Sequence, residues 1–214
     1  MNELLEKAYT LMTNSEYEES LKIYKNILYS HIENDIGTKI RAIKECFILS
    51  QNYSPAKEIL LSYKNSLLKK IKENSIINTD CLIEYYEICY LSSNDKEFLE
   101  LFEYICKVDT ESAQAVYTIV SKILINNKRW DLCNICISDA MNYSLKLLEQ
   151  YDELIRISNS HFNGDYNKEY NFNICNQLQT LFWILKVGER DKESKKILSF
   201  IRKELLNRNI QCEE

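Results

Sequence analysis

Glycine and proline are scarce in this chain of 214 residues, which contains 3 glycines and 1 proline. Sandwiches, barrels and doubly wound folds use these residues in their many turns, and average usage is roughly 7% and 5%. Their scarcity therefore favours long helices joined by short connections. Three glycines also leave too little material for a glycine-rich phosphate loop.

The chain also lacks an excess of positive charge and a long apolar run. Its 27 Lys and Arg stand against 32 Asp and Glu, so the net charge of −5 gives no overall attraction to nucleic acid or anionic lipid. No run reaches the roughly 18 apolar residues of a membrane span. The start, MNELLEKAYTLM, has no basic segment or cleavage site of a signal peptide. We therefore expect a cytoplasmic protein without nucleic-acid or membrane partners.

Apolar residues recur at helical spacing in successive pairs of segments, which predicts antiparallel helical hairpins. Ser15 with Glu18 is typical of a capping box, and Ser54 before Pro55 is typical of a helix start. A helix that begins near Trp130 is expected to continue to Ala140. The predicted helices are 2–13, 16–31, 36–50, a segment from Pro55, 79–91, 95–107, a segment from Thr110, a segment from Trp130, 144–161, a segment ending near Val187, and 190–209.

The hairpins resemble one another when they are aligned on their turns. The aligned positions are Ser20, Ala56, Phe98, Cys133 and Glu169, and they recur at intervals of about 35 to 42 residues. An aromatic residue stands three positions earlier in four of them, at Tyr17, Tyr53, Trp130 and Tyr166. Such a hairpin cannot bury its own apolar face, so a period of this length predicts that the hairpins stack.

The first two hairpins carry large and small residues in the order of a known repeat. They are Leu4, Ala8, Leu11, Tyr17, Ser20, Tyr24 and Ile27, then Tyr53, Ala56, Leu60 and Tyr63. With these residues the chain resembles the tetratricopeptide-repeat superfamily, well over residues 2–142 and loosely over 143–214. The third hairpin departs, because bulky Tyr86 and Phe98 stand where small residues are expected.

The resemblance implies an all-α, right-handed solenoid of about five hairpins plus a C-terminal capping helix, as a single domain over 1–214. It also implies non-catalytic binding of a protein or peptide, as a scaffold, adaptor or chaperone, on the concave face formed by the first helix of each pair. The expected partner-binding residues are Leu5, Tyr9, Met12, Arg41, Glu45, Ile83, Glu87, Tyr90 and Lys122. The alternative is a peptide-sensing regulatory module of a bacterial signalling or transcription system.

The sequence offers little for catalysis, a cofactor or a metal. Cys133 and Cys136 form a C-x-x-C within a predicted helix, where packing explains them better than redox or metal chemistry. His31 and His161 lie near predicted helix ends, where the helix dipole favours them. A nucleophile formed by His161 with Cys175 has no supporting motif. We therefore expect no enzyme, no cofactor and no metal site.

Two further expectations concern cysteines and association. Five of the eight cysteines fall on apolar stripes, where reduced thiols pack as small hydrophobic groups. These are Cys46, Cys89, Cys106, Cys133 and Cys175. The apolar stripe of the last helix, Ile197, Leu198, Ile201 and Leu205, predicts either a cap for the stack or a homo-oligomer interface. Burial of the stripe would indicate the cap.

Overall fold

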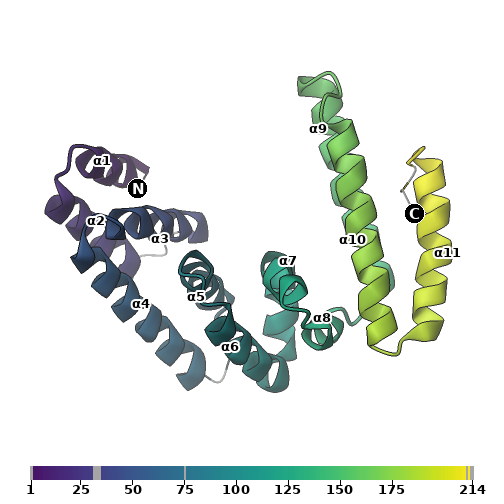
Figure 1. The fold of residues 1–214 in the computed structure, drawn as a ribbon, viewed down its shortest axis with the longest axis horizontal. Coiled ribbons are helices and arrows are strands. Elements are labelled where there is room, and N and C mark those ends of the chain that lie inside the picture. Colours follow the sequence, from purple (N-terminus) through teal and green to yellow (C-terminus); the bar gives the residue numbers. More distant parts are fainter. Residues whose placement is uncertain (1, 31–34, 75, 211, 213–214) are drawn as a thin grey trace. The chain divides into compact units, whose positions relative to one another are not determined.

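The computed structural model describes residues 2–30, 35–74, 76–210 and 212. These residues form eleven helices and no strand (Figure 1), which confirms the all-α prediction. Within them, no helix is both long and apolar enough to cross a membrane. The chain separates into two compact units, Met1–Ile123 and Leu124–Glu214, with the boundary inside α7. A single continuous solenoid therefore stays a prediction.

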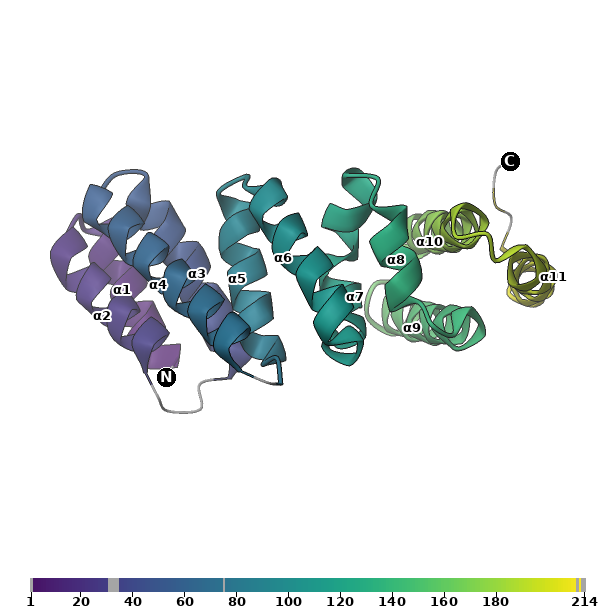
Figure 2. The ribbon, with the colours of Figure 1, turned by 90° about the horizontal axis from the view of Figure 1, so that it is seen from below.

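The first unit consists of consecutive helical hairpins. Helices α1 and α3 pack on each other as well as on their own hairpin partners, and so do α2 and α4, so the first two hairpins lie side by side (Figure 2). Helix α5 packs on both α3 and α4. Its helices are α1 (Asn2–Thr13), α2 (Tyr17–Tyr29), α3 (Ile36–Ser50), α4 (Ser54–Glu73), α5 (Thr79–Leu91), α6 (Asp95–Val108) and most of α7 (Thr110–Asn126).

The second unit is built around two long helices. α9 packs along α10, and α11 packs on both of them, while the short α8 also packs on α10. The apolar stripe of α11 is buried at Ile197, Ile201 and Leu205, so this stripe serves packing within the chain. Association of two chains through α11 stays a prediction. The helices are α8 (Trp130–Cys136), α9 (Ala140–His161), α10 (Asn167–Val187) and α11 (Asp191–Asn207).

Five helices end in the same way. The residue after the helix cap has a positive φ, and the next N–H donates to the carbonyl five residues earlier, as in a Schellman motif. At the end of α1, for example, the Glu16 N–H donates to the Leu11 carbonyl at 2.9 Å. Because glycines are few, other residues occupy the left-handed position. They are Ser15, Ser93, Lys128, Glu189 and Asn209.

This motif overturns the predicted capping box at Ser15. Ser15 has φ 65° and closes α1, with its N–H donating to the Met12 carbonyl. Glu16 is the residue before α2, and its side chain caps nothing. Ser54 is likewise the first residue of α4 rather than its cap. The first prediction was wrong because Ser15 already closes α1, and the second because Tyr53 occupies the cap position before α4.

The predicted helix from Trp130 to Ala140 is also wrong. α8 ends at Cys136, and Ala140 is already the first residue of α9. The Asp139 carboxylate accepts the Asn142 N–H at 2.9 Å and caps α9. An N-cap of this kind contributes about 1 kcal/mol, which favours a new helix start over continuation.

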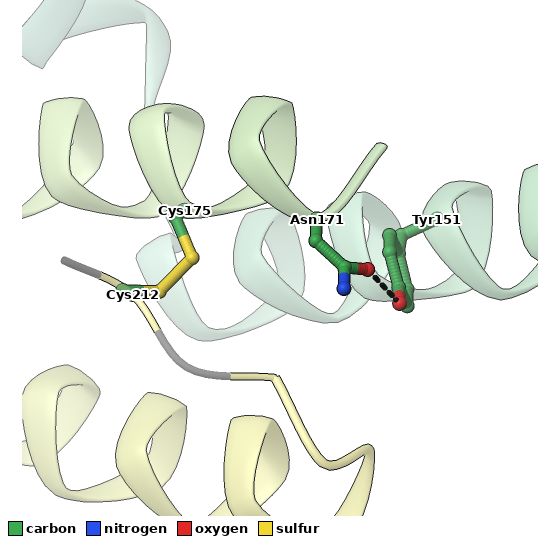
Figure 3. Close-up of a disulfide and its surroundings, with 4 residues drawn as sticks. All are labelled: Tyr151, Asn171, Cys175 and Cys212. Carbon is green, nitrogen blue, oxygen red and sulfur yellow. Dashed lines mark hydrogen bonds between the residues drawn. A yellow bond between two sulfur atoms is a disulfide. The ribbon is translucent and has the colours of Figure 1, made fainter. Parts of the chain in front are cut away.

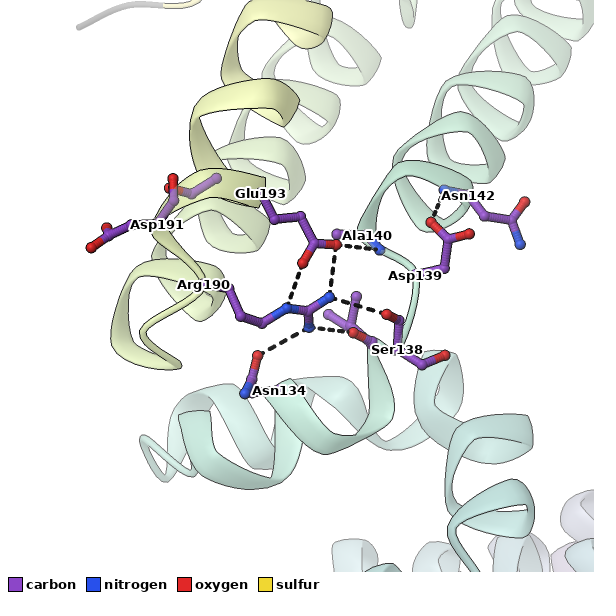
Figure 4. A network of polar contacts seen from close by, with 10 residues as sticks. Asn134, Ser138, Asp139, Ala140, Asn142, Arg190, Asp191 and Glu193 are labelled. Atoms are coloured by element: carbon purple, nitrogen blue, oxygen red, sulfur yellow. Dashed lines mark hydrogen bonds and ion pairs between the residues drawn. The ribbon is translucent and has the colours of Figure 1, made fainter.

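Arg190, in the turn between α10 and α11, holds this break in place (Figure 4). Its guanidinium donates to the carbonyls of Ile137 and Ser138, which the end of α8 leaves without helical partners. Glu193 accepts two hydrogen bonds from the same guanidinium at 2.7 Å and one from the Ala140 N–H at 3.3 Å. The break thus satisfies its polar groups through a side chain from another turn.

Cys175 of α10 forms a disulfide with Cys212 (Figure 3), so the prediction of a reduced, packing thiol is wrong for this residue. Near the disulfide, the Tyr151 hydroxyl on α9 donates to Asn171 Oδ1 on α10 at 2.7 Å. The other six cysteines are thiols, and five of them are buried. The packing role predicted for Cys46, Cys89, Cys106 and Cys133 is confirmed.

Candidate binding surface

Ion pairs connect the first helices of the three N-terminal hairpins. Arg41 on α3 reaches Glu6 on α1 at 2.7 Å. On the other side of α3, Lys44 reaches Glu87 on α5 at 3.4 Å. Two predicted partner-binding residues, Arg41 and Glu87, are therefore engaged within the chain. They align α1, α3 and α5 instead of offering free charges.

Three exposed apolar side chains lie beside these ion pairs. On each helix the residue one turn beyond an ion-paired residue lies on the same face, since positions three or four apart are neighbours. Tyr9 follows Glu6 in this way, Ile48 follows Lys44, and Tyr90 follows Glu87. Tyr9 is 44% exposed, Ile48 52% and Tyr90 45%. We call these three residues, two tyrosines with an isoleucine between them on α3, the aromatic row.

The other predicted residues divide by burial. Leu5 and Glu45 are buried, at 0% and 7% exposure, and so cannot meet a partner directly. Met12 and Ile83 are partly exposed, while Lys122 on α7 is exposed. Among the described contacts, nothing connects Lys122 with the aromatic row. The structure therefore supports Tyr9 and Tyr90 as surface residues and places Leu5 and Glu45 in the core.

Glu45 is buried because it pairs with a tyrosine from the previous hairpin. The Tyr24 hydroxyl on α2 donates to Glu45 Oε2 at 3.0 Å, and Arg41 Nε donates to Glu45 Oε1 at 2.7 Å. Burial, with the charge of Glu45, raises the pKa of Tyr24, so the phenol stays protonated and donates. Without such partners a buried carboxylate would cost several kcal/mol.

The next pair of hairpins repeats this contact. The Tyr63 hydroxyl on α4 donates to Glu84 on α5, and Lys39 lies 3.5 Å from the same carboxylate. In each pair, the glutamate follows the tyrosine by 21 residues in the sequence. Sequence reasoning missed them because it placed Glu45 on the binding face and gave Glu84 no role. The equal spacing of the two pairs was the available signal.

A third polar network joins α4 to α6. Lys64 Nζ lies 2.7 Å from Glu97 Oε2, and the Tyr85 hydroxyl donates to Glu97 Oε1 at 2.6 Å. Burial raises the pKa of the Glu97 carboxyl, but the hydrogen bonds from Lys64 and Tyr85 outweigh it, and the pKa lies below its ordinary value. Glu97 is therefore ionised at neutral pH, and its charge compensates that of the buried Lys64 ammonium.

Burial, a helix end and a disulfide account for the residues considered for chemistry that the structure describes. Cys133 and Cys136 are both buried on α8, and His161 lies in the last turn of α9 as predicted. Cys175 is in a disulfide, so it cannot act as a nucleophile with His161. His31 lies outside the described residues. In the part of the chain that the structure describes, no three His, Cys, Asp or Glu side chains are grouped to hold a metal ion.

No family model, curated protein or solved structure matches the chain. The resemblance to tetratricopeptide repeats therefore stays a prediction.

Proposed function

We propose that the chain is a non-catalytic, helical-repeat binding protein that holds a protein or peptide partner on the face formed by α1, α3 and α5. The observation that carries this proposal is the aromatic row: two exposed tyrosines and an isoleucine beside ion pairs that are already satisfied. Tyrosine is enriched among the residues that contribute most to binding, because it offers a large contact area with a polar tip.

The paired charges support a particular kind of partner. Arg41 and Glu87 are already paired with opposite charges within the chain. A partner would therefore bind this face chiefly through apolar contacts. An amphipathic helix or an extended peptide with apolar side chains fits such a face. The ion pairs fix the helices before binding, which reduces the entropy lost on association.

Peptide-library selection against the purified protein tests this proposal. Peptides recovered with the wild type should lose binding to the Tyr9→Ala plus Tyr90→Ala variant by about thirtyfold or more, since a central tyrosine contributes about 2 kcal/mol. Tyr166→Ala, which removes a tyrosine of similar exposure in the turn before α10, is the matched control. Unchanged binding to the double variant, with unchanged helical circular dichroism, would refute the proposal.

A further inference from the structure

A groove runs along α4 on the side that faces the α5–α6 hairpin. Helices α2 and α4 pack directly and share a tyrosine contact, since the rings of Tyr29 and Tyr63 lie 5.2 Å apart. Among the described residues, α4 and α6 do not pack in this way, and the Lys64–Glu97 ion pair bridges the space between them.

The ion pair divides the groove into two hollows. The first, of about 590 Å³, lies between the start of α4 and the α5–α6 turn, and its apolar lining is Phe47, Leu60, Leu61, Ile88 and Leu91. The second, of about 370 Å³, lies between the later part of α4 and α6, and is lined by Leu68, Leu101, Tyr85 and Tyr104 together with Lys72, Glu97 and Glu100. Each hollow is large enough for a bulky apolar side chain.

The distance between the hollows corresponds to two turns of a helix. Leu61 in the first hollow and Leu68 in the second are seven residues apart on α4, which is about 10.5 Å along the helix axis. A second helix lying along the groove would present residues i and i+7 at the same spacing. Its residue i+3 or i+4 would then meet the Lys64–Glu97 pair, where a polar side chain is required.

The charges on the two walls differ in sign. Helix α4 contributes Lys57 and Lys72, which are both exposed. Helix α6 contributes Glu100, whose contact with Lys96 is long, at 3.9 Å, and lies between highly exposed side chains. An exposed pair of this kind contributes little, so the Glu100 carboxylate can meet a positive charge on a partner.

We propose that this groove binds one amphipathic helix of a partner protein. The helix has large apolar residues at i and i+7, a polar residue at i+3 or i+4, an acidic flank toward α4 and a basic flank toward α6. The residues that line this groove include none of Tyr9, Ile48 and Tyr90, so the inference does not depend on the proposed function.

A fluorescent helical peptide of that pattern, with Leu at i and i+7, Asn at i+4, Glu on one flank and Lys on the other, tests the proposal by fluorescence polarisation. Saturable binding is expected, with at least about a tenfold loss on Leu61→Gln. Leu61 is 55% exposed, so this variant should keep its fold. A peptide with the second Leu at i+5 should bind no better than background.

Charge reversal supplies the sharper measurement. The double variant Lys57→Glu plus Lys72→Glu should bind the peptide more weakly than the wild type does. A second peptide, with Lys in place of the Glu residues that face α4, should regain affinity for this variant only. Lys69→Glu, on α4 but outside the groove lining, is the matched control. Failure of the first peptide to saturate, or equal binding of both peptides to both proteins, would overturn the proposal. The Tyr9→Ala plus Tyr90→Ala variant should bind the peptide as the wild type does.

Discussion

Loss of the Cys175–Cys212 disulfide should destabilise the second unit by a predictable amount. The bond joins residues 37 apart, and Cys212 lies beyond the last helix. In the chain-entropy model a closed loop of this length removes about 13 cal/mol/K from the unfolded chain, or about 3.8 kcal/mol at 25 °C. Measured effects are typically about 2 to 4 kcal/mol. Ile210, which follows α11, is itself buried, so we expect the end of α11 to remain packed after reduction.

Urea denaturation followed by circular dichroism measures this loss. The oxidised wild type should unfold at a higher urea concentration than the same protein in dithiothreitol, and Cys212→Ser should match the reduced wild type with or without reductant. Cys81→Ser, which removes a free cysteine, should leave the response to reductant intact. In urea without reductant, thiol titration should find six free thiols of the eight cysteines. Eight free thiols, or a midpoint that ignores reductant, would refute the reasoning.

Three other substitutions test the packing. Glu189→Gly should raise the free energy of unfolding by about 1 kcal/mol, because Glu189 has φ 57° and only glycine adopts this conformation without strain; a lower urea midpoint would contradict this. Gly188→Ala should cost about 1 kcal/mol, since its Cβ would lie 2.5 Å from the Asn134 side chain and displace it from its hydrogen bond with Arg190, and Asn134→Ala should abolish that cost in a double-mutant cycle. Tyr63→Phe should cost about 2 kcal/mol by thermal denaturation, because Glu84, at 1% exposure, loses a hydrogen-bond donor; an unchanged Tm would mean that the contact stabilises nothing.

Helix positions could be predicted from sequence because apolar spacing and polar turns agree along most of the chain. The ranges 2–13, 36–50 and 79–91 coincide with α1, α3 and α5. Such segments are amphipathic, and their periodicity is a local property that one sequence displays. Predicted and observed helix bounds agreed least where two local preferences compete. At Asp139 a capping side chain starts a new helix inside an otherwise apolar pattern.

The candidate site was predicted less well because burial of a charged residue depends on a distant partner. Glu45 was placed on the binding face together with Glu87, but its counterpart on α5 is Glu84, because each of these two glutamates accepts a hydrogen bond from a buried tyrosine 21 residues earlier. Glu45 and Glu84 are buried, while Glu87 is only partly covered. Helical spacing alone does not show which glutamate meets a tyrosine of the previous hairpin. The Cys175–Cys212 pairing was missed for a similar reason, since the spacing of eight cysteines does not determine which of them meet.

The buried tyrosine–glutamate contact offers a stricter measure of repetition than the small residues do. Tyr24 and Tyr63 are 39 residues apart, as are Glu45 and Glu84. One interval further along the chain, the two positions are Phe102 and an isoleucine at position 123, both buried. The phenol and the carboxylate are therefore absent together. A buried carboxylate without its hydrogen-bond donor would destabilise the fold more than a complete tyrosine–glutamate contact does. Two buried apolar residues, by contrast, leave no hydrogen bond unmade. If these positions meet in every repeat, both residues of the contact must be replaced together, as they are here. The unit that repeats in this part of the chain therefore includes the interface between hairpins as well as each hairpin.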